Sequence, residues 1–199
     1  GEGDQFLGIR VPEIRGLVKQ YKNTALTDIE SLVKSAWHEE RLLGWLLLVR
    51  QFQDQKNELS QKKLVDFYLT HTRFCNNWDL VDSTAHQMLG AWLLDRPTSL
   101  LKKLARSSSL WERRISIVAT YAFIRRGRFE DTFKMATLLL NDSEDLIHKA
   151  VGWMLREVGK HGGETALELF LLLYFDVLPR TTIRYAIERL PALRRGLYV

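Results

Sequence analysis

The stretch that decides the fold is NNWDLVD, residues 76–82, at the head of a long predicted helix. Asn77 is the expected N-cap, with its side chain satisfying one of the free N–H groups of the first turn. Asp79 then lies in the first turn, where the helix dipole favours a carboxylate. Asp82 lies a full turn further in, beyond the free N–H groups, so capping does not account for it. Trp78 and Asp82 share one helix face because they are four residues apart.

This helix is predicted to run from about Trp78 to Leu94 and to end before Pro97, because the residue ahead of a proline disfavours helical geometry. One face is apolar and should point into the core. Its members are Val81, Ala85, Met88 and Trp92. Asp82 therefore borders the core and does not face open water.

Other segments of the chain show helical periodicity too, and the alternating pattern of a strand is absent. The long helices begin near His38, Asn77, Leu110 and Glu144, at intervals of roughly 33 to 39 residues, and each has a shorter partner after it. This spacing predicts a stack of two-helix repeats of the HEAT or armadillo kind, with a concave binding face. We therefore predict an all-α fold, an α-α superhelix or solenoid, formed by residues 1–199 as a single domain.

Local signals set the bounds of the other predicted helices. Thr27 and Glu30 form a capping box that opens a helix. Residues 38–53 are apolar on nearly every side, which predicts a buried helix. A continuous helix is expected over residues 110–126, with Gly127 as its stop.

The composition is that of a globular protein with a sizeable core. The chain has 199 residues, of which 46% are hydrophobic and 27% charged. The lone Cys75 excludes a disulfide framework within the chain and fits a reducing cytosol. No stretch reaches the ~18 uninterrupted apolar residues of a membrane span. We therefore expect a cytoplasmic protein with no membrane partner.

The net charge of +5 permits a polyanionic partner. Basic side chains gather on the helix from Leu110, on the helix from Glu144 and near the C-terminus. On successive repeats of a curved stack they can track a phosphate backbone. For any single arginine the alternative is a solvated outer face, but for the C-terminal cluster as a whole we favour a polyanion.

The familiar signatures of cofactor and metal chemistry are missing. There is no glycine-rich phosphate loop, and the five histidines and one cysteine give no zinc spacing, so we expect no cofactor and no metal. His86 shares a face with Asp82, for which a hydrogen bond on the helix surface is a better explanation than a metal site. Most Trp residues at helical spacing belong to a core. Trp78 and Trp153 are the expected exceptions, because each flanks its core stripe and adjoins charge.

Four short motifs, in this order along the chain, resemble one known family. They are GIRVP at residues 8–12, WDLVD at 78–82, WERR at 111–114 and KAVGWMLRE at 149–157. Together they are similar to the motifs of the AlkD-like DNA alkylation-repair glycosylases, over nearly the whole chain. That family has a further helix ahead of the turn at Gly8, and we expect this chain to lack it.

The resemblance implies a solenoid of HEAT-like repeats that excises N3- and N7-alkylated purines from duplex DNA. By motif position, Asp82 would be the catalytic carboxylate. Trp78 and Trp153 would be aromatic walls, and Arg114 would bind the DNA backbone. The expected DNA contacts as a whole are Arg10, Arg113, Arg114, Lys149, Arg156, Lys160 and Arg184.

We therefore expect a monomeric, monofunctional DNA glycosylase that acts on double-stranded DNA containing alkylated purines, at the bacterial nucleoid. An N-alkylated purine is already cationic and leaves without a general acid. A carboxylate that stabilises the developing sugar cation or orients water then suffices. Two alternatives stay open: a non-catalytic HEAT-repeat protein that binds branched or damaged DNA, and a protein-binding helical scaffold.

Overall fold

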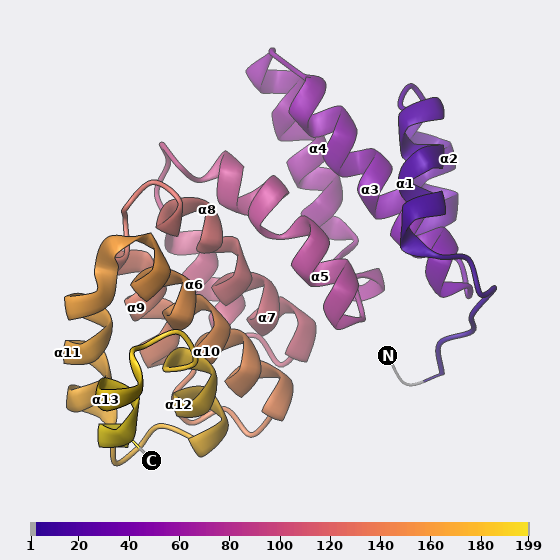
Figure 1. The fold of residues 1–199 in the computed structure, drawn as a ribbon. Helices are drawn as coiled ribbons and strands as arrows, with labels where there is room; N and C mark the ends of the chain where they lie inside the picture. Colours follow the sequence, from indigo (N-terminus) through magenta and orange to yellow (C-terminus); the bar gives the residue numbers. More distant parts are fainter. Residues whose placement is uncertain (1–2, 199) are drawn as a thin grey trace. The chain divides into compact units, whose positions relative to one another are not determined.

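The computed structural model describes residues 3–198, and within that range the chain forms helices and turns but no strand. The predicted all-α, helical-repeat fold is confirmed (Figure 1). No helix in the described range is long and apolar enough to cross a bilayer. The chain divides into two compact units, Gly1–Trp92 and Leu93–Val199, and each is described by itself. The expectation of a single domain stays a prediction.

The first unit is organised around α3, which packs against α1, α2, α4 and α5. The bounds are α1 (Val11–Gln20), α2 (Leu26–Val33), α3 (His38–Asp54), α4 (Glu58–Thr70) and α5 (Trp78–Thr84). As predicted, α3 is buried along most of its length. Its Trp45 is fully buried and meets the ring of Tyr68 edge-on, with centroids 5.3 Å apart.

Two predicted local features of other helices are wrong. The capping box at Thr27 does not form, because α2 already begins at Leu26 and the Glu30 carboxylate binds Lys34 and His71 instead. The continuous helix expected over residues 110–126 is interrupted at Thr120. The Thr120 hydroxyl donates to the carbonyl of Ile117 at 2.6 Å, the kind of local bond that competes with regular helix.

The helix at the head of the predicted site begins at Trp78, with Asn77 as its N-cap, as expected. The Asn77 side chain does not cap the helix, however. Its Nδ2 donates to Oδ2 of Asp4 at 2.8 Å. The cap is therefore used to hold a distant segment rather than to satisfy the first turn.

The same helix changes its winding after α5. Residues His86–Gly90 form a π turn, in which the Gly90 N–H donates to the Ala85 carbonyl at 2.9 Å. Val81, Ala85 and Met88 are fully buried, as predicted. Trp92 is only half-buried, so its place in the predicted core stripe is wrong. A π turn takes up one residue more than an α turn, and this shift brings Leu93 to the core instead.

In the second unit, α10 packs against α7, α11 and α12. The helix α6 packs against α7 and α9. The bounds are α6 (Ser99–Ala105), α7 (Leu110–Ala119), α8 (Tyr121–Ile124), α9 (Glu130–Leu138), α10 (Asp145–Val158), α11 (Glu164–Tyr174), α12 (Arg180–Ala186) and α13 (Ala192–Arg195). A π turn over Gly159–Gly163 follows α10.

The helices α10 and α12 approach each other closely at Gly152. A Cβ atom at Gly152 would lie 2.5 Å from Cβ of Tyr185 and 2.6 Å from the carbonyl oxygen of Thr182. The Thr182 hydroxyl also donates to the carbonyl of His148 at 3.1 Å. Only glycine permits this approach, so Gly152 fixes how closely α12 packs on α10.

Candidate functional site

Trp78 and Asp82 occupy the first two turns of α5, one turn apart on the same helix face. The Trp78 side chain is 54% exposed, and Asp82 is half-buried. Between them, Leu80 and Val81 are fully buried and anchor the opposite face of the helix. The structure therefore presents an exposed aromatic ring and a partly shielded carboxylate side by side, as the spacing predicted.

The neighbouring carboxylate, Asp79, has a different environment. Its Oδ2 lies 2.8 Å from Nε2 of His38, a buried residue at the start of α3. The other ring nitrogen of His38, Nδ1, lies 3.4 Å from Oδ2 of Asp4. Asp79 thus links the heads of α3 and α5, whereas Asp82 lies one turn further along α5.

A buried ion pair extends this network. Oδ1 of Asp4 lies 2.5 Å from Nη2 of Arg41, and the two side chains are 4% and 5% exposed. Arg41 Nη1 also donates to the carbonyls of Ser35 and Ala36, at 2.9 and 3.0 Å. Asp4 also accepts a hydrogen bond from Asn77, so it links the segment ahead of α1 to the N-terminal ends of α3 and α5. This cluster was not predicted from the sequence, in which its only signal is the charged run His38 to Arg41 at the start of an otherwise apolar helix.

Glu39 holds the next part of the same segment. Its carboxylate accepts hydrogen bonds from the backbone N–H groups of Leu7 and Gly8, at 2.9 and 2.8 Å. Burial acts to raise the pKa of Glu39, but these N–H donors outweigh it and lower the pKa. Gly8 has a φ of +80°, which suits glycine, and the turn leads to the exposed Arg10, paired with Glu13 at 2.8 Å.

Cys75 lies just ahead of α5 and is fully buried. Burial is the main cause that raises its pKa to about 12, and the charges of Asp79 and Asp82 act in the same direction. The hydroxyls of Thr84 and Tyr68 act to lower this pKa but do not offset the burial. Because the thiolate is the reactive form of cysteine, Cys75 is a packing residue.

Two of the arginines predicted to bind DNA, Arg113 and Arg114, have side chains that are largely shielded from solvent in the second unit. Arg114 is 5% exposed, and its Nη1 donates to the carbonyl of Leu146 in the first turn of α10. Arg113 grips both oxygens of Asp142, at 2.6 and 3.2 Å, and also donates to the carbonyl of Ser107. Both residues therefore stabilise the start of α10. This structural role was not predicted from the sequence. Nothing in the structure tests their contacts with DNA.

Trp153, the second predicted aromatic residue, is half-buried on α10. Its ring centroid lies 6.4 Å from that of Tyr121, the first residue of α8. Tyr121 in turn meets the ring of His161 edge-on at 6.0 Å. Tyr121 and His161 had not been predicted beside Trp153, because each depends on an irregular turn, at Thr120 and at Gly159–Gly163.

The remaining basic residues predicted to bind DNA in this unit lie on the surface of α10, the turn after it, and α12. Arg184 is exposed. Three others have carboxylate neighbours: Lys149 with Asp145 at 2.7 Å, Arg156 with Glu188, and Lys160 with Glu157 at 3.3 Å. Their positive charge is thus partly balanced within the unit. Among residues 3–198 there is no group of three or more His, Cys, Asp or Glu side chains that could hold a metal ion.

The family model described as "DNA alkylation repair enzyme" matches residues 1–190. No curated protein matches the chain. Among solved structures, the chain is similar to a "Predicted DNA alkylation repair enzyme from Enterococcus faecalis", with a TM-score of 0.74 and 19% sequence identity. That likeness covers 96% of this chain and 90% of the other, and at such low identity it concerns the fold alone.

Proposed function

This chain belongs to the family of DNA alkylation repair enzymes, and we propose that it is a monofunctional DNA glycosylase for N3- and N7-alkylated purines in duplex DNA. The observation that carries the proposal is the arrangement at the head of α5. Trp78 is exposed and Asp82 is half-buried on the same face, while the nearby Asp79 is engaged by His38. Of the two carboxylates, Asp82 is the one that accompanies an exposed aromatic surface.

The chemistry of the lesion matches this pair of side chains. Alkylation at N3 or N7 leaves the purine with a positive charge, so the base departs with the electron pair of the N-glycosidic bond. Positive charge builds on the deoxyribose, and water adds to the sugar carbon that the base leaves. A fixed carboxylate stabilises that charge and orients the water, and an aromatic face attracts the same cation. The products are a free alkylpurine and an abasic site.

In the second unit, we propose roles that follow from exposure. Arg184 and Lys160, with Lys149 and Arg156, would contact DNA phosphates, and Trp153 would offer a second aromatic surface. Arg114 is buried, so its role rests on its place in the WERR motif: it would bind the backbone with a guanidinium that the Leu146 carbonyl orients. We assign Arg113 a structural role, because Asp142 holds both arms of its guanidinium.

The decisive experiment compares Asp82→Asn with its matched neighbour Asp79→Asn on a duplex that contains 7-methylguanine. Loss of an electrostatic stabiliser of the transition state costs ~2.7–4 kcal/mol, or about a hundred- to thousandfold in rate. Asp82→Asn should lose that much excision while keeping the native circular dichroism and duplex affinity. Asp79→Asn should lose less activity but more stability, because it replaces the carboxylate that contacts His38 with a neutral amide. Release of free 7-methylguanine at a near-native rate by Asp82→Asn would exclude Asp82 as the catalytic carboxylate.

The same proposal predicts selectivity for cationic lesions. Trp78, Trp153 and Arg114 offer no proton to a neutral leaving base, since arginine keeps its proton at working pH. Duplexes with 7-methylguanine or 3-methyladenine should therefore yield abasic sites, detected by alkaline cleavage. Duplexes with uracil, 8-oxoguanine or ethenoadenine should stay intact. Efficient removal of any of these neutral bases would require a general acid that the proposal lacks, and His86→Ala would be the next variant.

DNA affinity should also depend steeply on salt, which separates this proposal from a protein-binding scaffold. Each phosphate contact contributes about 0.9 to the slope of log affinity against log salt. Arg184→Ala should flatten the slope by about 0.9, whereas Arg113→Ala should leave the slope unchanged and lower the melting temperature. A native slope near zero in fluorescence anisotropy titrations would favour the scaffold instead.

A further inference from the structure

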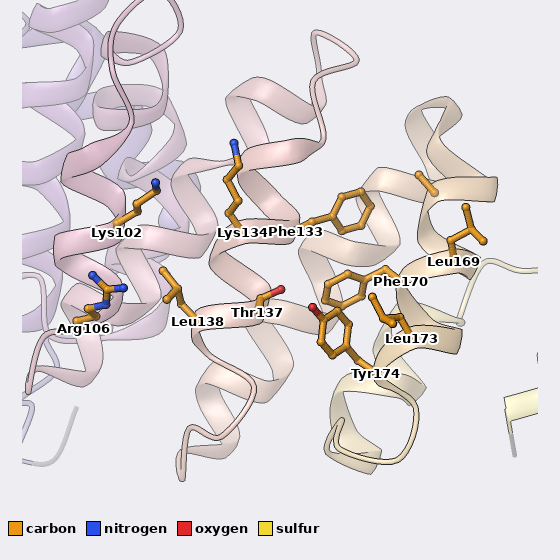
Figure 2. A pocket seen from close by; sticks show the side chains of 11 residues that line it. Lys102, Arg106, Phe133, Lys134, Thr137, Leu138, Leu169, Phe170, Leu173 and Tyr174 are labelled. Atoms are coloured by element: carbon orange, nitrogen blue, oxygen red, sulfur yellow. The ribbon is translucent and has the colours of Figure 1, made fainter.

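The second unit carries an apolar groove that the proposed excision chemistry does not use (Figure 2). It is an open hollow of about 570 Å³ lined by residues of α6, α9 and α11 and by Arg106, directly after α6. Its aromatic floor consists of Phe133, Phe170 and Tyr174. The rings of Phe133 and Phe170 stack at 5.1 Å, and that of Tyr174 lies 4.7 Å from Phe170.

One side of this groove is a row of exposed leucines on α11. Leu169, Leu172 and Leu173 are 62%, 67% and 74% exposed, and their spacing of three and four residues places them on adjoining helix faces. Leu169 and Leu173 line the cavity itself. Single exposed leucines are ordinary, but a contiguous apolar row beside a cavity marks an interaction surface.

The opposite side of the groove is basic. Lys102 comes from α6, Arg106 directly follows α6, and Lys134 comes from α9; all three are exposed. None of the described residues that line the groove carries a carboxylate. On the rim, Nζ of Lys134 lies 4.0 Å from Oδ1 of Asp131, which is buried. The groove is therefore complementary to a ligand with an apolar face and an acidic flank.

We propose that this groove binds an acidic amphipathic helix of a partner protein. A helix that lays its apolar face into a groove is a recurring mode of protein recognition, and acidic residues beside that face would meet the basic rim. A second copy of this chain is a poorer occupant. In a two-fold contact of this face with itself, Lys102, Arg106 and Lys134 of both copies would approach one another. The proposal does not depend on Asp82 or on the excision activity.

The test uses two fluorescein-labelled synthetic peptides with leucines at positions i, i+3, i+4 and i+7 of each repeat. One carries glutamate at the remaining positions, and its twin carries lysine there. In anisotropy titrations, the native protein should bind the glutamate peptide at least tenfold more tightly than the lysine peptide. Leu173→Glu should weaken binding of the glutamate peptide at least tenfold. The matched control is Leu193→Glu, on α13 outside the groove, where the native leucine is 92% exposed, and it should bind as the native protein does.

A charge reversal then tests the rim. The double variant Lys102→Glu/Lys134→Glu should prefer the lysine peptide, while Lys63→Glu, on α4 of the first unit, should keep the native preference. Equal binding of both peptides by the native protein would overturn the proposal, as would equal damage from Leu173→Glu and Leu193→Glu. A native dimer that Leu173→Glu converts to a monomer in sedimentation would assign the groove to a second copy. Displacement of the peptide by plain duplex DNA would assign it to DNA.

Discussion

The heads of α3 and α5 in the first unit, and the contact of α10 with α12 in the second, hold their helices in opposite ways. Each region supports one of the two tryptophans that the sequence singles out, Trp78 and Trp153. Beside Trp78 the support is a buried network of charges that includes Asp79. Beside Trp153 it is the close backbone contact at the preceding residue, Gly152. The first arrangement is sensitive to charge and the second to volume, so they should fail under different changes.

The difference follows from what each contact removes from water. The Asp4–Arg41 pair is nearly inaccessible, so both charges have lost most of their hydration and depend on their bonds within the chain. At Gly152 there is no charge, and stability depends on how closely two backbones approach. A change that keeps volume but alters charge should therefore matter more at the heads of α3 and α5, and an added methyl group should matter more at Gly152.

The largest effect on stability is expected for Arg41→Ala. Removing one partner of a buried ion pair typically costs about 3–5 kcal/mol, because the other charge stays buried. Here the carbonyls of Ser35 and Ala36 also lose a donor. Urea unfolding at pH 7, followed by circular dichroism, measures the loss. Arg50→Ala is the control: its pair with Asp54 is about half exposed and should contribute about 0.5 kcal/mol or less. Similar losses for the two variants would contradict a buried, charge-dependent network.

Gly152→Ala should come next, with a loss of about 1–3 kcal/mol. The added Cβ meets the Thr182 carbonyl and Cβ of Tyr185, neither of which can move without a shift of α12. Gly16→Ala on α1 is the matched control, since its new Cβ meets nothing within 4 Å. It should stabilise the protein by about 0.5–1 kcal/mol through helix propensity. Calorimetric melting separates the two. Equally small changes in melting temperature for Gly152→Ala and Gly16→Ala would mean that α12 shifts to accommodate the added Cβ without loss of stability.

The smallest of the three effects is a pH dependence confined to the first unit. The pKa of Glu39 is lowered on folding, so its contribution to stability is complete above its ordinary pKa of 4.5. That contribution is lost as the pH falls through the folded-state value. The stability difference between native protein and Glu39→Gln should therefore be largest at pH 7 and shrink below pH 4.5. Urea titrations from pH 7 to pH 3 measure it.

Glu130→Gln, an exposed change in the second unit, serves as the control for that titration. Its difference from the native protein should stay small and flat across the same range. A Glu39→Gln difference that grew on acidification would reverse the sign and contradict the hydrogen bonds to Leu7 and Gly8.

Much of the fold was predictable because its signals are local. The four helices predicted to be long begin at His38, Trp78, Leu110 and Asp145, each within one residue of the predicted start, although those from Trp78 and Leu110 end earlier than predicted. Caps, turn residues and apolar periodicity act over a few residues and can be read directly. The breaks inside helices were not predictable in this way. The π turn at 86–90 and the interruption at Thr120 arise where packing and side-chain hydroxyls compete with the regular backbone bonds.

In the candidate site, too, the local features were predictable from the sequence and the long-range contacts were not. The shared face of Trp78 and Asp82 followed from their spacing on one helix. The contact of Asp79 with His38 could not be predicted in this way, because the two residues are 41 positions apart in the chain. The hydrogen bond from Asn77 to Asp4 joins residues that are 73 positions apart. Arg114 shows the limit most clearly. A basic cluster suggests exposure to a polyanion, yet this arginine is buried against the first turn of α10.

The burial of Cys75 has a practical consequence for chemical labelling. A thiol with a pKa of about 12 and no accessible surface stays unmodified by maleimide at neutral pH. The folded protein therefore does not react with thiol reagents at Cys75, so Cys75 can be kept when a second cysteine is introduced for labelling. A thiol introduced by Thr137→Cys, at an exposed position on α9 beside the groove, would take up a single fluorophore. The emission of that dye would then report directly on what enters the groove.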